Sequence, residues 1–148
     1  MRTYYDTSFV LKTYIQEANT LEAIGILRAA SEAIPLSHVL ELELRTAMRN
    51  QHGRGEITAG ELRAALHTLE SDLAKGVLSR PGYDLEAVYL RAEKLSAKHA
   101  AATLCRSADI LHVASALEAG CSAFGSFDER QRKVAALVGL KLVPLRTP

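Results

Sequence analysis

Short apolar segments alternate with longer helical segments along almost the whole chain, and this alternation limits the folds open to it. The segments that favour strands lie at about residues 2–6, 32–36, 122–125 and 140–143. The segments with helical patterns lie at about residues 7–14, 18–30, 37–52, 58–75, 84–99, 107–119 and 128–137. Short strands that alternate with helices predict an α/β fold, in which helices cover a parallel sheet.

Several residues predict where these helices begin and end. We expect Thr7 or Ser8 to cap the first helix, and Thr58 with Glu61 reads as a capping box. Asp84 is expected to cap the helix over residues 84–99. The helix over residues 107–119 is apolar nearly all round, so we expect it to be buried and to end at Gly120.

Size and charge fit one globular domain over residues 1–148 and exclude several classes of protein. Lys and Arg number 18 against 17 Asp and Glu, which excludes a bulk polycationic nucleic-acid binder. No apolar run approaches the ~20 residues of a membrane span, and the N-terminus lacks the apolar stretch of a signal peptide. These two features predict no membrane partner. The two cysteines form no disulfide framework, which favours a reducing cytoplasm.

Two aspartates stand where a strand gives way to a helix. Asp6 follows the first predicted strand, and Asp128 repeats the arrangement later in the chain, with the Ser126 hydroxyl two residues before it. Functional sites of parallel sheets gather beyond the carboxyl ends of the strands. Both residues also have a simpler interpretation, since an aspartate at a helix start caps the helix and interacts favourably with its dipole.

Two further acids stand in apolar surroundings. Glu43 has Val39, Leu40, Thr46 and Ala47 as helical neighbours, and a buried carboxylate is costly unless it is paired, protonated or bound to a metal. A buried partner such as an arginine would also explain it. Asp109 opens the apolar helix, where Arg106 offers a counter-charge. His112, one turn on, is either a ligand or a core histidine with a satisfied ring.

The parallel fold brings Asp6, Glu43, Asp109 and Asp128 towards one end of the sheet. Four neighbouring carboxylates repel one another, so a cation is needed to offset their charge. Hard oxygen ligands without a thiolate pair favour Mg²⁺ or Mn²⁺ over zinc. Such a centre lowers the pKa of a bound water and stabilises a leaving oxygen, which points to phosphodiester hydrolysis in nucleic acid.

The sequence resembles a PIN domain, and in particular a VapC-type toxin ribonuclease of a type II toxin–antitoxin system. The resemblance rests on residues 5–8, 37–44 with Ala47, 106–116 and 126–128. It implies a three-layer α/β/α sandwich with a short-stranded parallel central sheet and a Mg²⁺- or Mn²⁺-dependent endoribonuclease site. Asp6, Glu43, Asp109 and Asp128 match the family's acidic quartet, and Thr7 and Ser126 match hydroxyl positions that hold carboxylates or a bound water.

The resemblance also implies partners: an RNA substrate, and a cognate antitoxin that inserts a basic side chain into the acidic pocket. A homodimer or a toxin–antitoxin hetero-oligomer in a prokaryotic cytoplasm is implied in the same way. The antitoxin would cover apolar surface around Leu11, Tyr14 and Ile15, or the stripe of Leu62, Leu66, Leu69 and Leu73. That stripe equally fits an intramolecular helix hairpin.

Phosphates are held largely by Lys and Arg, and the arginines nearest the acids are Arg106, Arg130 and Arg132. Each of them could equally be a solvated surface charge. Two other classes of function remain open: a non-catalytic PIN-like RNA-binding or scaffold module, and a phosphotransfer α/β domain. The complete acidic set disfavours a non-catalytic module. Asp6-Thr7-Ser8 lacks the further aspartate that is typical of aspartyl-phosphatases, which disfavours a phosphotransfer domain.

Overall fold

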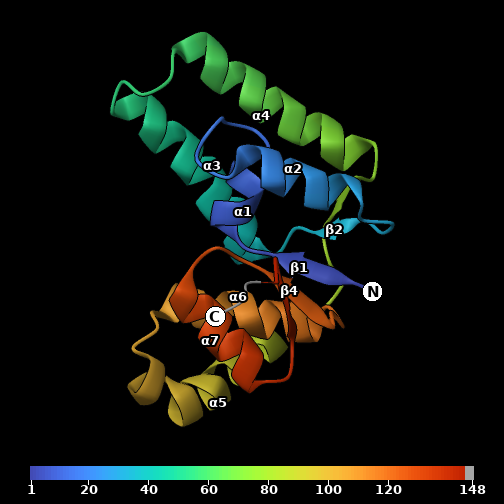
Figure 1. Cartoon of the computed structure of the whole chain (residues 1–148), viewed down its shortest axis with the longest axis vertical. Coiled ribbons are helices and arrows are strands. Elements are labelled where there is room, and N and C mark those ends of the chain that lie inside the picture. Colours follow the sequence, from blue (N-terminus) through green and yellow to red (C-terminus); the bar gives the residue numbers. More distant parts are fainter. Residues whose placement is uncertain (146–148) are drawn as a thin grey trace.

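The computed structural model describes residues 1–145, in which strands and helices alternate (Figure 1). The strands are β1 (Thr3–Tyr5), β2 (Ile34–Pro35), β3 (Leu78–Ser79), β4 (Ala123–Gly125) and β5 (Lys141–Val143). The helices are α1 (Thr7–Leu11), α2 (Thr20–Arg28), α3 (His38–Gly53), α4 (Ala59–Ala74), α5 (Leu85–Thr103), α6 (Ser107–Glu118) and α7 (Glu129–Leu137). None of these helices has both the length and the apolar character that a membrane crossing requires.

All strand pairs are parallel, as predicted, but they form two sheets. The larger sheet has the order β1-β4-β5, with Tyr5 paired to Gly125 and Gly125 to Val143. A separate pair, β2 with β3, joins Ile34 to Leu78. The sequence does not predict β3, because a strand of two residues is too short to show a period.

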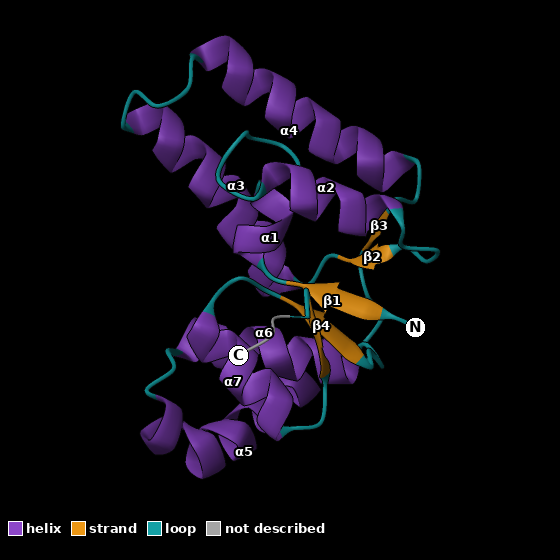
Figure 2. Ribbon diagram, in the orientation of Figure 1, coloured by secondary structure: helices purple, strands orange, loops and turns teal. Residues whose placement is uncertain are grey.

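The helices form a layer on each side of the strands (Figure 2). In this view α1, α2, α3 and α4 lie above the strands, and α5, α6 and α7 lie below them. The strands supply the centre of the core, where Tyr4 stacks on Phe124 at 5.5 Å between ring centroids and both are fully buried. The expected three-layer α/β/α architecture is therefore confirmed.

The leucine stripe of α4 packs within the chain. Leu69 is fully buried, and Leu62, Leu66 and Leu73 are half-buried against the same core, while α4 lies beside α3 (Figure 1). The stripe thus has the contacts of an intramolecular helix hairpin. An apolar stripe turned towards the core is also what a 3.6-residue period predicts.

Most caps follow the predicted residues, but α1 and α2 are shorter than expected, ending at Leu11 and Arg28 rather than near residues 14 and 30. Thr58 and Glu61 form the capping box, Asp84 caps α5, and Gly120 adopts a φ of +71° after α6. Asp6, rather than Thr7 or Ser8, caps α1, because its carboxylate accepts from the Phe9 N–H. The end of α5 lies four residues beyond the expected position, since its last turn is rich in alanine, the best helix former.

Candidate functional site

The site is built where β1 and β4 end side by side. The Asp6 N–H donates to the Gly125 carbonyl at 2.9 Å, which extends the strand pairing by one residue and brings Asp6 next to Ser126. Gly125 is required here, since a Cβ at that position would lie 2.3 Å from Cδ1 of Tyr5. The close approach of the Tyr5 ring thus fixes the spacing of the two strand ends.

Asp6 is almost fully buried and accepts hydrogen bonds from three donors, one of which contacts both carboxylate oxygens. Its carboxylate accepts from the Phe9 N–H at 2.9 Å, from the Ser8 hydroxyl at 2.9 and 3.0 Å, and from the Ser126 hydroxyl at 2.7 Å. Burial raises the pKa of Asp6, and these hydrogen bonds together with the nearby His112 lower it only in part. The protein's own donors therefore do not fully offset this negative charge.

Ser126 connects Asp6 to Asp128. Its buried hydroxyl donates to Asp6 and accepts from the Asp128 N–H at 2.9 Å. The Asp128 carboxylate caps α7 by accepting from the N–H groups of Arg130 and Gln131 at 2.9 and 3.0 Å. Asp128 thus has the capping role that its position predicts, and its backbone N–H, rather than its carboxylate, shares the Ser126 hydroxyl with Asp6.

Gln131 connects Asp128 to Asp109. The Gln131 side-chain amide donates to Asp109 Oδ1 at 2.9 Å, and the backbone N–H of Gln131 is one of the two that donate to the Asp128 carboxylate. Asp109 is buried and accepts on Oδ2 from the Arg106 N–H at 2.9 Å, with the Arg106 Nε at 3.5 Å. Sequence reasoning missed Gln131, because its burial and its bond to an acid of another helix leave no signal in the sequence pattern.

Glu43 projects from the edge of the buried face of α3, with 39% of its side chain exposed. Glu43 thus lies beside the apolar stripe as expected, but its side chain is only partly buried. Oε1 of Glu43 accepts from the Thr7 hydroxyl at 2.8 Å and pairs with Nε2 of His112. The hydrogen bond to His112 is the main cause that lowers the pKa of Glu43. The buried partner that the alternative interpretation requires is present, and it is a histidine rather than an arginine.

His112 is buried, and both its ring nitrogens have partners. Nδ1 lies 2.8 Å from the Tyr4 hydroxyl, and Nε2 pairs with Glu43. This is the arrangement of a core histidine with a satisfied ring. His112 is nevertheless part of the site, because its partner is one of the four acids.

Three of the four acids are linked through intervening polar groups, whereas Glu43 is held separately by Thr7 and His112. Ser126 and Gln131 link Asp6, Asp128 and Asp109. In the described part of the chain, no three His, Cys, Asp or Glu side chains converge closely enough to hold a metal ion as they stand. The ligand atoms on offer are carboxylate oxygens, which fit a hard divalent cation. A cation would also offset the charge of Asp6, whose pKa is raised by burial. To bind one, the carboxylates would exchange hydrogen bonds for metal contacts.

The three arginines predicted to face RNA differ in exposure. Arg106 is 71% exposed beside Asp109, and Arg130 is exposed in the first turn of α7. Arg132 is buried instead, and its guanidinium donates to the carbonyls of Ser126, Val143 and Pro144 at 2.8–3.2 Å. The prediction for Arg132 was wrong, because one helical turn after Asp128 the side chain points back onto the strand ends.

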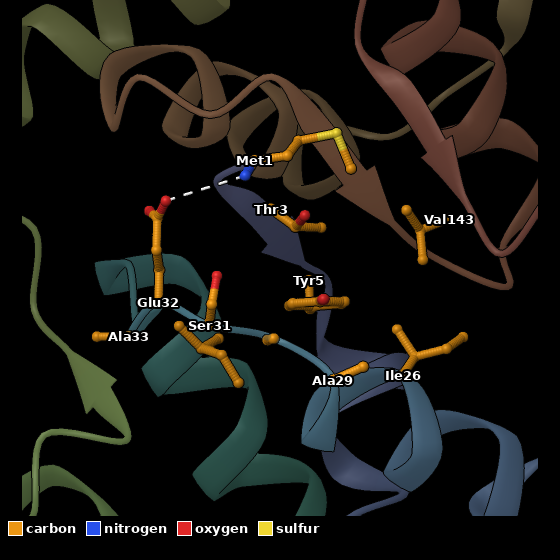
Figure 3. A pocket seen from close by; sticks show the side chains of 11 residues that line it. Met1, Thr3, Tyr5, Ile26, Ala29, Ser31, Glu32, Ala33 and Val143 are labelled. Carbon is orange, nitrogen blue, oxygen red and sulfur yellow. Dashed lines mark ion pairs between the residues drawn. The ribbon is translucent and has the colours of Figure 1, made fainter.

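A separate hollow lies along the free side of β1 (Figure 3). It is lined by Thr3, Tyr5, Ile26 and Val143, among others, and none of the four acids borders it. At its rim the Met1 amino group lies 4.0 Å from the Glu32 carboxylate. Its lining includes one acid, Glu32, so it lacks the group of carboxylates found at the candidate site.

The comparison with known families agrees with this geometry. The PIN domain family matches residues 3–137, a span that includes all four acids. A search of curated proteins finds no match to the chain. PIN domains are typically nucleases that use divalent metal ions. The chain belongs to the PIN domain family.

Proposed function

We propose that the protein is a metal-dependent endoribonuclease of the VapC type, the toxin of a toxin–antitoxin pair, with one PIN domain over residues 1–148. The observation that carries this proposal is the hydrogen-bonded chain from Asp6 through Ser126, Asp128 and Gln131 to Asp109. Carboxylates that one hydrogen-bonded network gathers at one end of a parallel sheet are suited to hold a cation and act on a phosphodiester.

In this proposal Asp6, Glu43, Asp109 and Asp128 hold Mg²⁺ or Mn²⁺. The cation supplies a water of lowered pKa and neutralises charge that develops on the phosphate. The chain's own residues set the geometry: Ser126 orients Asp6 by a 2.7 Å hydrogen bond, and Thr7 orients Glu43 by one of 2.8 Å.

The RNA substrate would be held by the exposed guanidinium groups at the rim of the site. Arg106 and Arg130 are exposed on either side of the buried Asp109 and Gln131, so they are suited to contact phosphates. The low aromatic content, 5% of residues, favours recognition of RNA shape over stacking on bases.

A cognate antitoxin would inhibit the enzyme by placing a basic side chain among the acids, in a homodimer or a toxin–antitoxin hetero-oligomer in a prokaryotic cytoplasm. Leu11 is buried, but Tyr14 and Ile15 line a surface hollow with Ala64, Ala65 and Thr68 of α4. This hollow supports an apolar antitoxin contact beside α1. The α4 leucine stripe does not support one, because it is packed within the chain.

The test is cleavage of structured RNA with Mg²⁺, Mn²⁺ or EDTA by three proteins: the wild type, D6N and D84N. Asp84 is an exposed helix cap, and asparagine caps helices as well as aspartate, so D84N is a matched control. We expect the wild type and D84N to cleave only with metal and D6N to lose cleavage. Equal cleavage by D6N and the wild type, or full activity in EDTA, would contradict the proposal.

A further inference from the structure

A line of buried polar groups leads from the start of α3 to Glu43. The Leu40 N–H donates to Ser37 Oγ at 3.2 Å, and Ser37 Oγ lies 2.6 Å from the Tyr4 hydroxyl. The Tyr4 hydroxyl lies 2.8 Å from Nδ1 of His112, whose Nε2 pairs with Glu43. Ser37, Tyr4 and His112 are at most 1% exposed. The line thus runs through the core and ends at one acid of the site.

The carboxylate end of this line determines which ring nitrogen of His112 donates. An ionised carboxylate can only accept, so the proton that faces Glu43 is on Nε2. In a ring with this one proton, Nδ1 accepts from the Tyr4 hydroxyl, and the Tyr4 hydroxyl accepts from Ser37 Oγ. Ser37 Oγ also accepts from the Leu40 N–H, since a hydroxyl has one proton to donate and two lone pairs that accept. This set of directions gives every group in the line a partner.

The end of the line determines how Glu43 is held. The Thr7 hydroxyl and His112 Nε2 both bond to Oε1 rather than to Oε2. A glutamate with 39% of its side chain exposed would otherwise sample several rotamers. Two donors on one oxygen, one of them rigidly buried, fix the plane of the carboxylate and the direction of its second oxygen.

We propose that His112 is a positioning residue that acts through Glu43, with Tyr4 and Ser37 holding its ring in the Nε2–H tautomer. The inference rests on the proposed function in one respect, namely that Glu43 is a ligand of the divalent cation. Groups that orient metal ligands in this way influence metal affinity without touching the metal. A histidine that only filled the core would stabilise the fold and leave Mn²⁺ affinity unaltered.

Two amide variants separate the two sides of the ring. In H112Q the side-chain nitrogen reaches the position of Nε2 and keeps a donor towards Glu43. In H112N the amide reaches only the position of Nδ1, so the partner of Tyr4 is kept and the donor to Glu43 is lost. Mn²⁺ binding, followed by electron paramagnetic resonance, should weaken about 10-fold or more in H112N. H112Q should recover most of that loss.

A double-mutant cycle with E43Q tests whether His112 acts through Glu43. We expect H112N to weaken Mn²⁺ binding in the wild-type background and to have no further effect in E43Q. Effects of H112N and E43Q that multiply would overturn the proposal, and so would unaltered Mn²⁺ binding in H112N. If the wild type binds no Mn²⁺, the proposed function fails, and the role assigned to His112 fails with it.

The tautomer is tested without any metal. Long-range ¹H–¹⁵N spectra of the metal-free wild-type chain at pH 7.5 should show His112 protonated on Nε2 and unprotonated on Nδ1. A ring protonated on Nδ1, or on both nitrogens, would overturn the assignment even if the protein cleaves RNA. This measurement needs no variant, so it holds even if a substitution at His112 unfolds the protein.

Discussion

Ser126 is the residue whose loss should affect fold and site together, so S126A is the sharpest mutational test. The substitution removes a 2.7 Å hydrogen bond to the buried Asp6 carboxylate, and bonds to charged groups contribute about 1.5–3 kcal/mol. It also removes the acceptor of the Asp128 N–H, which costs about 1 kcal/mol more at this half-buried position. We therefore expect S126A to lower the free energy of unfolding by about 3 kcal/mol.

The assay is urea denaturation of the metal-free protein, supported by thermal unfolding. For a chain of this size, 3 kcal/mol corresponds to a fall in Tm of about 6–12 °C. The matched control is S122A, which removes an exposed serine hydroxyl just before β4 and should change stability by less than about 0.5 kcal/mol. If S126A were as stable as S122A, the hydrogen-bonded link between Asp6 and Asp128 would be refuted.

Three further predictions concern stability, titration and reactivity. G125A should lose about 1–3 kcal/mol of stability, because its Cβ meets a ring atom at 2.3 Å, whereas G25A, in open space on α2, should not be destabilised in the same urea titration. Burial raises the pKa of Asp6 above its value in the unfolded chain, so protonation of Asp6 favours the folded state. This stabilisation is lost as the pH rises through the raised pKa. The hydrogen bond from His112 lowers the pKa of Glu43, so stability is lost as the pH falls through it. Carboxyl ¹³C titration of the metal-free protein should therefore show the pKa of Asp6 above, and the pKa of Glu43 below, the ordinary value for its residue type; a shift in the opposite direction would contradict the assignment for that residue. Burial raises the pKa of the Cys121 thiol to about 11, so iodoacetamide at pH 8 should modify it on the order of 100-fold more slowly than in urea; equal rates would show that the thiol is accessible.

The order of the elements could be predicted from the sequence because local patterns determine it. The apolar pattern of residues 107–119 predicts a buried helix, and α6 is one. The Thr58–Glu61 pair predicts a capping box, which forms within four residues of chain. The second sheet could not be predicted, since β3 has two residues and its pairing with β2 depends on contacts between distant segments.

The positions of the acids were predicted better than their partners. Asp6 and Asp128 lie at helix starts that the strand–helix alternation already indicates. Gln131 and His112 could not be recognised as partners of the acids. Gln131 bonds to Asp109 and His112 bonds to Glu43, and these acids lie on other elements, 22 and 69 residues away in sequence. Arg132 was mistaken for a surface charge for the same reason: its buried acceptors are backbone carbonyls that no side-chain pattern reveals.

The central claim, that the four acids together hold a divalent cation, is tested most directly by locating Mn²⁺. Crystals of the wild-type chain soaked in Mn²⁺ would be measured for anomalous scattering from the metal. We expect an anomalous peak at about 2.1–2.2 Å from carboxylate oxygens of Asp6 and at least one of Glu43, Asp109 and Asp128, and no such peak in D6N crystals. A peak bound elsewhere, or equal occupancy in D6N, would contradict the central claim.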